Sequence, residues 1–364
     1  MNTEIYESFI QLVRLGIGIG MVNDSILTVH APDDWQSLKA LAVAQGLSAV
    51  VLDALSSISD NLTETMPVQM KLEWIGEVLQ SEFVHSTQQK TAETMAQLFH
   101  NNNIRTYVLK GAVVAECYPN PQHRYSVDLD CFLKPNKGIF DACLLGNNLV
   151  KGKGYQVDTD FYKNSTFHLP GLIVENHKYL TPFRANKILK RFETLLQSLL
   201  AKDEGQDRFD GAWLYRPSMM VSALLLIEHA YSHFLHEGLT WRMILDWGLF
   251  NKKHEEEIDW SVFDEYIDEF GFRNFYGSYV RLGDYLLGGL SEEALTKTDR
   301  LMLADIWAPL DLHDSVRGVN GKLALVGNTW RARWKYRYFT EMNWVSALWI
   351  QVKGFLFEKD PKMN

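Results

Sequence analysis

Residues 107–133, YVLKGAVVAECYPNPQHRYSVDLDCFL, decide the interpretation of this chain, because they join two predicted strands through a short helix. The stretches 104–109 and 125–133 are apolar and rich in residues that strands favour. Gly111 begins an apolar helical stretch, and Pro119 and Pro121 end it. The second strand contains Asp128-Leu129-Asp130, so two carboxylates stand in a run that is otherwise suited to burial.

Alternation along a strand places the two carboxylates on one face. Two acids on one rigid face can hold a hard cation, and Mg²⁺ prefers a few carboxylates together with water and phosphate. The alternative is a solvated face whose acids only protect a sheet edge from aggregation. The residues expected to face the core are Val127, Leu129, Cys131 and Leu133.

Two neighbouring features favour the metal site. Lys110-Gly111 lies between a strand and a helix, where backbone N–H groups can bind phosphate and Gly allows a close approach, although an ordinary turn has the same appearance. Glu175 and His177 share one face of a later predicted strand within 171–180. A third acid on a neighbouring strand can complete the shell of a second metal and deprotonate an attacking hydroxyl.

These elements, taken in order, resemble a known family. Leu109-Lys110-Gly111-Ala112, Tyr118-Pro119, Arg124 and Asp128-Leu129-Asp130 are similar to the signature of the uncharacterised nucleotidyltransferase family, within the DNA polymerase beta-like superfamily. Glu175 and His177 fit the later strand of that family. The stretches Asp34-Trp35, 228–230 and 241–246 resemble its helical flanks, so the resemblance covers roughly residues 5–290.

The resemblance implies an α+β fold, with a nucleotidyltransferase-type mixed β-sheet between N-terminal helices and a C-terminal helical domain. It also implies transfer of a nucleoside monophosphate from an NTP to an acceptor hydroxyl or amine, with Mg²⁺ or Mn²⁺ and with release of pyrophosphate. The implied metal ligands and catalytic residues are Asp128, Asp130 and Glu175. Lys110 and Gly111 would hold the phosphates. Arg124 would neutralise the triphosphate or orient Asp128.

Two positions depart from the family pattern. Ala112 stands where the superfamily usually has Ser, and Val127 stands where the family often has Gly. The alternative hypothesis is therefore a catalytically inactive scaffold of the same fold that binds a nucleotide or a partner. The same order of motifs is also similar to nucleotidyltransferase toxins of abortive-infection systems, which keeps RNA among the acceptors alongside a small molecule, a sugar or a protein.

The hydrophobic pattern divides the chain into three regions. Residues 1–100 are predicted to be helical, 101–181 to form the nucleotidyltransferase core, and 182–364 to form helices followed by an aromatic-basic tail. Helices are expected at about 183–201, 217–236, 240–254, 260–288 and 292–306. The tail WRARWKYRYF, 330–339, interleaves cations with aromatic rings. Such a segment can stack on single-stranded nucleic acid, lie in a membrane interface, or pack on the domain, which is the favoured interpretation.

Two residue pairs in the helical part have i, i+4 spacing. The spacing of His229 and His233 is compatible with a metal site. We favour histidines that pack in the core or support the active-site residues over a zinc site. If their helix packs over the catalytic cleft, they could instead contact the acceptor. For Arg242 and Asp246 the simplest interpretation is an ion pair on the helix surface. The alternative is that both residues line the active-site pocket.

Composition limits the partners and the compartment. The formal charge of −9 argues against a protein that coats nucleic acid, so the expected partners are an NTP and a small or locally recognised acceptor. A membrane surface reached through the tail is a less favoured alternative. Three scattered cysteines predict no disulfide framework. The N-terminus lacks the pattern of a signal peptide, and no apolar run reaches the ~18 residues of a membrane span, so a cytoplasmic location is expected.

Overall fold

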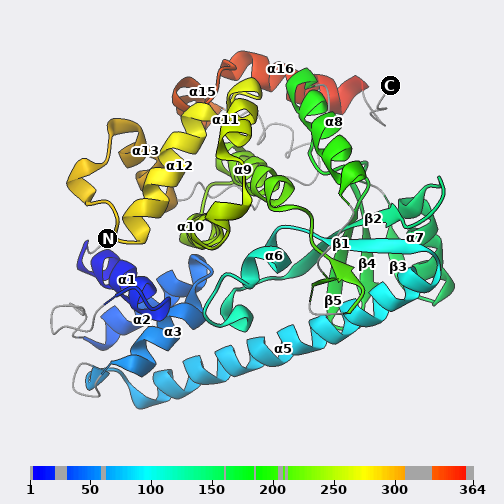
Figure 1. Cartoon of the computed structure of the whole chain (residues 1–364). Coiled ribbons are helices and arrows are strands. Elements are labelled where there is room, and N and C mark those ends of the chain that lie inside the picture. Colours follow the sequence, from blue (N-terminus) through cyan, green and yellow to red (C-terminus); the bar gives the residue numbers. More distant parts are fainter. Residues whose placement is uncertain are drawn as a thin grey trace.

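The fold combines one mixed sheet, which lies toward one end of the molecule, with many helices, and this confirms the α+β class (Figure 1). The coordinates are a computed structural model that describes residues 3–20, 31–58, 63–159, 161–183, 186–203, 208–209, 212–307 and 330–357. Within these ranges the strands are ordered β3-β4-β5-β2-β1-β7-β6. Their bounds are β1 Ile104–Val108, β2 Asp128–Pro135, β3 Gln156–Asp158, β4 Asn164–Leu169, β5 Leu172–His177, β6 Arg208–Phe209 and β7 Leu214–Tyr215.

Strand β2 is central, because it pairs antiparallel with β1 and parallel with β5. Strand β1 in turn pairs in parallel with β7, which the sequence did not reveal because β6 and β7 have two residues each. The helix α6 (Gly111–Ala115) and the 3-10 turn η1 (Pro121–His123) connect β1 to β2. The predicted strand–helix–strand arrangement of residues 107–133 is therefore confirmed.

The core face of β2 follows the predicted alternation only in its second half. Cys131 and Leu133 are buried, and Leu129 is half-buried. Val127 was expected to face the core, but it is 57% exposed. The reason is that β2 begins at Asp128, so Val127 precedes the strand and does not follow its alternation.

Helix α5 (Val68–Asn101) connects the N-terminal helices to the sheet and runs along one whole side of the molecule (Figure 1). The N-terminal helices are α1 (Thr3–Gly16), α2 (Pro32–Ala44) and α3 (Ser48–Ser57). His123 lies between α3 and α5, with Nδ1 2.6 Å from an Asp53 oxygen and Nε2 2.6 Å from a Glu82 oxygen. The hydrogen bond with Asp53 and the neighbouring Glu82 raise the pKa of His123 despite its partial burial. This ion triplet fixes the segment that precedes Arg124.

The C-terminal half is helical; Figure 1 shows α8 near the strands on the side away from α5, and the other C-terminal helices beside the sheet, across α6 from α5. The predicted helix 260–288 is in fact two helices, because Gly271, with φ +73°, ends the first of them. The remaining elements are α7 Ala142–Gly152, α8 Lys187–Lys202, α9 Met219–His236, α10 Trp241–His254, η2 Glu255–Glu257, α11 Trp260–Glu269, α12 Arg273–Leu286, η3 Glu292–Ala294, α13 Lys297–Trp307, α15 Arg333–Phe339 and α16 Trp344–Phe357.

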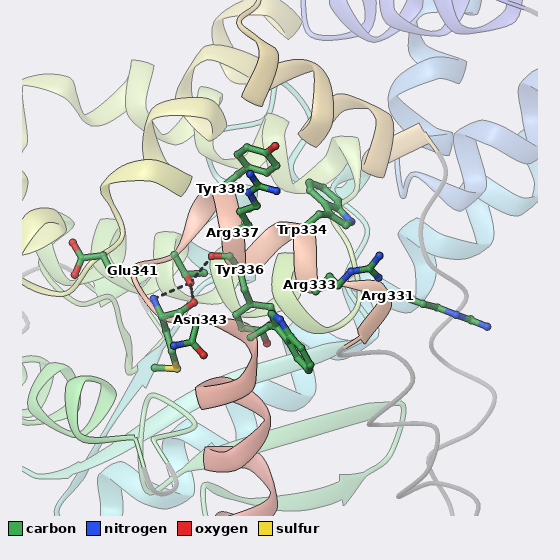
Figure 2. A pocket seen from close by; sticks show the side chains of 11 residues that line it. Arg331, Arg333, Trp334, Tyr336, Arg337, Tyr338, Glu341 and Asn343 are labelled. Carbon is green, nitrogen blue, oxygen red and sulfur yellow. Dashed lines mark hydrogen bonds between the residues drawn. The ribbon is translucent and has the colours of Figure 1, made fainter.

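Helix α15 packs on this helical half, as the favoured interpretation of the tail expected. Lys335 is fully buried, donates to the carbonyl oxygen of Phe234 at 2.6 Å and pairs with Asp305 at 2.7 Å. The Arg333 guanidinium lies 4.5 Å from the Trp330 ring centre. Figure 2 shows this segment and the surface pocket along it. Among the helices of the described ranges, none combines the length and apolar character needed to cross a bilayer.

Candidate active site

Strands β2 and β5 bring three predicted residues together. Their parallel register sets Asp130 beside Glu175 and Phe132 beside His177. One ligand atom from each of Asp130, Glu175 and His177 lies within 4.8 Å of the other two. Two carboxylate oxygens and one imidazole nitrogen at this separation form a donor set that fits a single divalent cation.

The hydrogen bonds of His177 also fit a cation. Burial lowers the pKa of His177 to about 4, against the opposing effect of Asp130, so the imidazole is neutral at pH 7. Its Nε2 lies 2.5 Å from an Asp130 oxygen, and its Nδ1 lies 3.2 Å from the carbonyl oxygen of Tyr179. A neutral imidazole has one N–H and cannot donate to both oxygens. If Nδ1–H donates to Tyr179, the Nε2 lone pair is free for a metal, which is the usual arrangement around a histidine ligand.

Lys110 supplies positive charge to the same cluster. Its Nζ lies 3.2 Å from an Asp130 oxygen, and its side chain is buried. Burial alone would raise the pKa of Asp130, but the charge of Lys110, together with the hydrogen bond that His177 donates when its Nε2 carries the proton, holds it well below its usual range. The backbone of Lys110 has φ 45° and ψ −105°, a rare conformation for a residue with a side chain. Such strain concentrates at functional sites.

Asp128 lies on the same face of β2, but outside the group of Asp130, Glu175 and His177. It pairs in register with Ile173 and lines a cavity of about 390 Å³ together with Gly111 and Arg124. Burial, and then the charge of Asp130, raise the pKa of Asp128. The same two effects raise the pKa of Glu175. The three predicted carboxylates therefore influence one another, as acids around a shared cation site do.

Arg124 forms a buried ion pair with a residue of α10. Its Nε and Nη2 donate to the two oxygens of Asp246, at 3.0 and 2.8 Å, and both side chains are buried. Tyr118 donates its hydroxyl to the same carboxylate at 2.8 Å. Arg242 reaches Asp246 at 3.4 Å, so the predicted i, i+4 pair is present and belongs to a buried network. This network reaches the Lys110-Gly111 turn through Arg124, whose guanidinium lies against Gly111.

The two predicted histidines of α9 have different surroundings. His229 lies within electrostatic reach of Lys110 and Asp130, and burial followed by the charge of Lys110 lowers its pKa well below the usual value. His233 pairs with Glu237 at 2.7 Å. The two rings touch edge to face, with centres 4.4 Å apart. Of the two histidines, His229 is the one whose charge interacts with that of Asp130.

Two further residues of the site were not identified from the sequence. Lys163 is half-buried, and burial followed by the charge of Lys110 lowers its pKa. Its Nζ forms no hydrogen bond or ion pair with the described residues, and the charges of Asp130 and Glu175 also act on it. Glu228, on α9, is 3% exposed, and burial raises its pKa to about 7 against the effects of Lys163 and Lys110. Lys163 belongs to no motif, and Glu228 begins the stretch 228–230 that resembles the family but was given no role from the sequence, so the fold was needed to place both.

Comparison with known proteins identifies the family. A family model described as "Uncharacterised nucleotidyltransferase" matches residues 31–288, which is more than half of the chain and includes the whole site described above. No curated protein and no solved structure matches the chain. The family expected from the order of motifs is therefore confirmed.

Proposed function

The chain belongs to the uncharacterised nucleotidyltransferase family, and from this premise we propose that it moves a nucleoside monophosphate from an NTP to an acceptor, with Mg²⁺ or Mn²⁺ and with release of pyrophosphate. The observation that carries the proposal is the convergence of Asp130, Glu175 and His177 from two paired strands. These three residues would hold the cation, and Asp128 would contribute from the edge of the site. When bound, the cation would polarise the α-phosphoryl group and neutralise charge that develops there.

The positive side chains of the site support binding of a triphosphate. Lys110 is held at the cluster by Asp130, and the described structure gives Lys163 no ion-pair partner. A half-buried cation without a partner interacts more strongly with an entering anion than a fully solvated one does, because the local dielectric constant is lower. Lys163 would therefore contact the phosphates directly, and Lys110 would share its charge between Asp130 and the nucleotide.

Thermal unfolding tests the proposal. We would measure the melting temperature with each of the four NTPs, with and without Mg²⁺, for the wild type and for Asp130→Asn. Asp158→Asn is the matched control, because Asp158 is an exposed strand carboxylate away from the cluster. A ligand at a hundred times its Kd adds about 2.7 kcal/mol, so we expect a rise of a few degrees in the wild type and in Asp158→Asn only.

Transfer itself needs a second measurement. The NTP that stabilises the protein would be supplied with a label in its α-phosphate and incubated with candidate acceptors. Labelled product from the wild type, and at least about a hundredfold less from Asp130→Asn, would support catalysis. Equal stabilisation of wild type and Asp130→Asn by every NTP would overturn the metal-dependent site. Metal-dependent binding with no pyrophosphate release under any condition would favour the scaffold alternative.

A further inference from the structure

A second cavity, of about 320 Å³, lies between α8, α9 and the C-terminal segment. Its lining is mostly aliphatic and aromatic, and no Lys or Arg of the described residues contributes to it. The volume suits one small molecule or the end of a larger one. Aromatic residues of the lining are Phe161, Tyr162, Tyr231, Phe270, Phe272 and Tyr336.

Glu228 is the unusual member of this lining. It is 3% exposed, and within the described part of the chain no side chain or backbone N–H donates a hydrogen bond to its carboxylate. The Glu228 side chain has lost most of its contact with water and its carboxylate gains no protein donor in exchange, which is costly for a charged group. A molecule in the cavity that donated a hydrogen bond to Glu228 would remove this cost.

Lys163 connects the cavity to the nucleotide site. The charge of Glu228 acts on Lys163, and so do the charges of Asp130 and Glu175. Phe161 and Tyr162, which directly precede Lys163, lie in the lining of the cavity. A ligand in the cavity would therefore lie next to the residue that we assign to the phosphates.

We propose that this cavity binds the acceptor of the nucleotidyl group, a compact molecule with an apolar or aromatic body whose hydroxyl donates a hydrogen bond to Glu228. This inference rests on the proposed function. The acidic lining, with Glu228 inside and Glu341 beside it, disfavours acceptors that carry phosphate or carboxylate. A polymer could place only a terminal group in a cavity of this size.

The transfer balances with Glu228 as the proton acceptor. The acceptor oxygen forms a bond to the α-phosphorus, and the bond from that phosphorus to the bridging oxygen of the β-phosphate breaks. Pyrophosphate leaves with the electron pair of the broken bond, and the hydroxyl proton passes to the carboxylate of Glu228. A carboxylate whose pKa is near 7 is suited to accept a proton at neutral pH.

The wall of the cavity includes a part of the chain that the family match does not reach. Tyr336, Thr340 and Met342 line it from beyond residue 288. The Thr340 hydroxyl lies 3.1 Å from the carbonyl oxygen of Tyr336 and 2.6 Å from that of Met342, which fixes the turn between α15 and α16 (Figure 2). The C-terminal segment would therefore determine which acceptor fits, while the family core handles the nucleotide.

A matched pair of probes tests the cavity. We would measure the binding of 2-phenylethanol, and of ethylbenzene, which lacks the hydroxyl, by ligand-observed NMR on the full chain. We expect the alcohol to bind at least about tenfold more tightly, because it donates a hydrogen bond to a charged group that ethylbenzene cannot make. Glu228→Leu should abolish this preference. Glu237→Leu, which removes an exposed glutamate at the end of the same helix, should preserve it.

A second variant locates the binding. Ala347 lines the cavity, so Ala347→Trp should fill it and reduce the binding of both probes at least about tenfold. Stabilisation by Mg²⁺ and NTP would be measured on the same samples. Probe binding that is absent from the wild type, or unchanged in Glu228→Leu, would overturn the inference even where NTP still stabilises the protein. Probe binding without any effect of NTP would instead count against the proposed function and leave the cavity as a ligand site.

Discussion

The guanidinium of Arg124 crosses Gly111 so closely that a β-carbon on Gly111 would lie 2.7 Å from Nη1 of Arg124. The Gly of the Lys-Gly motif is therefore required by a side chain from the same motif. Arg124 cannot move aside easily, because both oxygens of Asp246 hold it. The sequence interpretation assigned this Gly to the approach of phosphate, and the structure provides a second reason for it.

Gly111→Ala is expected to destabilise the protein. The added methyl would push Arg124 away from Asp246, and overpacking of this kind costs about 1–3 kcal/mol in the free energy of unfolding. Urea denaturation would measure the loss. Gly76→Ala is the matched control, because the site of its β-carbon in α5 is open, and it should stabilise the protein by about 0.5–1 kcal/mol. An unchanged midpoint for Gly111→Ala would contradict the contact.

Asp246→Ala should lower the free energy of unfolding by about 3–5 kcal/mol, because it leaves the charge of Arg124 buried without a partner. Asp264→Ala removes an exposed partner of Arg273 and should cost less than about 1 kcal/mol. Chemical denaturation of both variants would give the comparison. Similar losses for the two would show that the buried pair contributes no more than a surface one.

Lys163→Met should weaken the binding of Mg²⁺-NTP by about ten- to a hundredfold, because it removes a charged donor to the phosphates. Stability without ligand should not fall, since Lys163 makes no ion pair with the described residues. Calorimetric titration would measure the affinity. Lys178→Met, which removes a cation beside Tyr179 at the end of β5, is the control. Equal affinities for the wild type and Lys163→Met would remove Lys163 from the site.

Glu228→Gln should stabilise the protein at alkaline pH and not at acid pH. The pKa of Glu228 is about 7 in the folded chain, against an ordinary value of 4.5. Between these values the folded state keeps a proton that the unfolded chain has released, so the stability of the wild type falls as pH rises through this window. The whole effect is about 3 kcal/mol at most. Gln cannot lose a proton, so its advantage should grow from pH 4.5 to pH 7 and then remain constant.

Urea denaturation at pH 5 and pH 8 would measure this advantage, with Glu237→Gln as the exposed control on the same helix. A constant difference between Glu228→Gln and the wild type at the two pH values would refute the buried charge. A variant that is more stable but binds the hydroxyl probe less well would show that the wild type retains Glu228 for function at the expense of stability.

The sequence predicted the central part of the fold because its signals are local. The Lys110-Gly111 pair follows the end of one apolar strand pattern, and Asp128 and Asp130 lie within the next one. Both patterns can be identified without tertiary information. Glu175 and His177 could be placed on one strand face by alternation, and their register with β2 then set them beside Asp130. The strand start at Asp128 was missed, since apolar Val127 continues the pattern of β2 without pairing in it.

The remainder of the site depends on long-range packing. Lys163 precedes β4, and nothing in its neighbours distinguishes it from a surface residue. Glu228 lies in the stretch 228–230 that resembles the family, but its burial and its place beside Lys163 depend on how α9 packs. The partner of Arg124 is 122 residues away, so the sequence could offer only the triphosphate or Asp128 as its contact. Asp246 was selected for its spacing from Arg242, while its main bonds go to Arg124 and Tyr118.

The separation of Arg124 from Asp246 has a consequence for synthesis on the ribosome. Strands β1, β2 and β5 emerge early, and all the candidate metal ligands are translated before α10 exists. The turn that carries Lys110 is not braced by Asp246 until α10 has emerged and docked. Nascent chains and products of premature termination would thus contain every candidate acidic ligand while Arg124, which lies against Gly111, still lacked its partner Asp246. The nucleotidyl transfer that we propose would therefore have its complete site only when the helical half has folded.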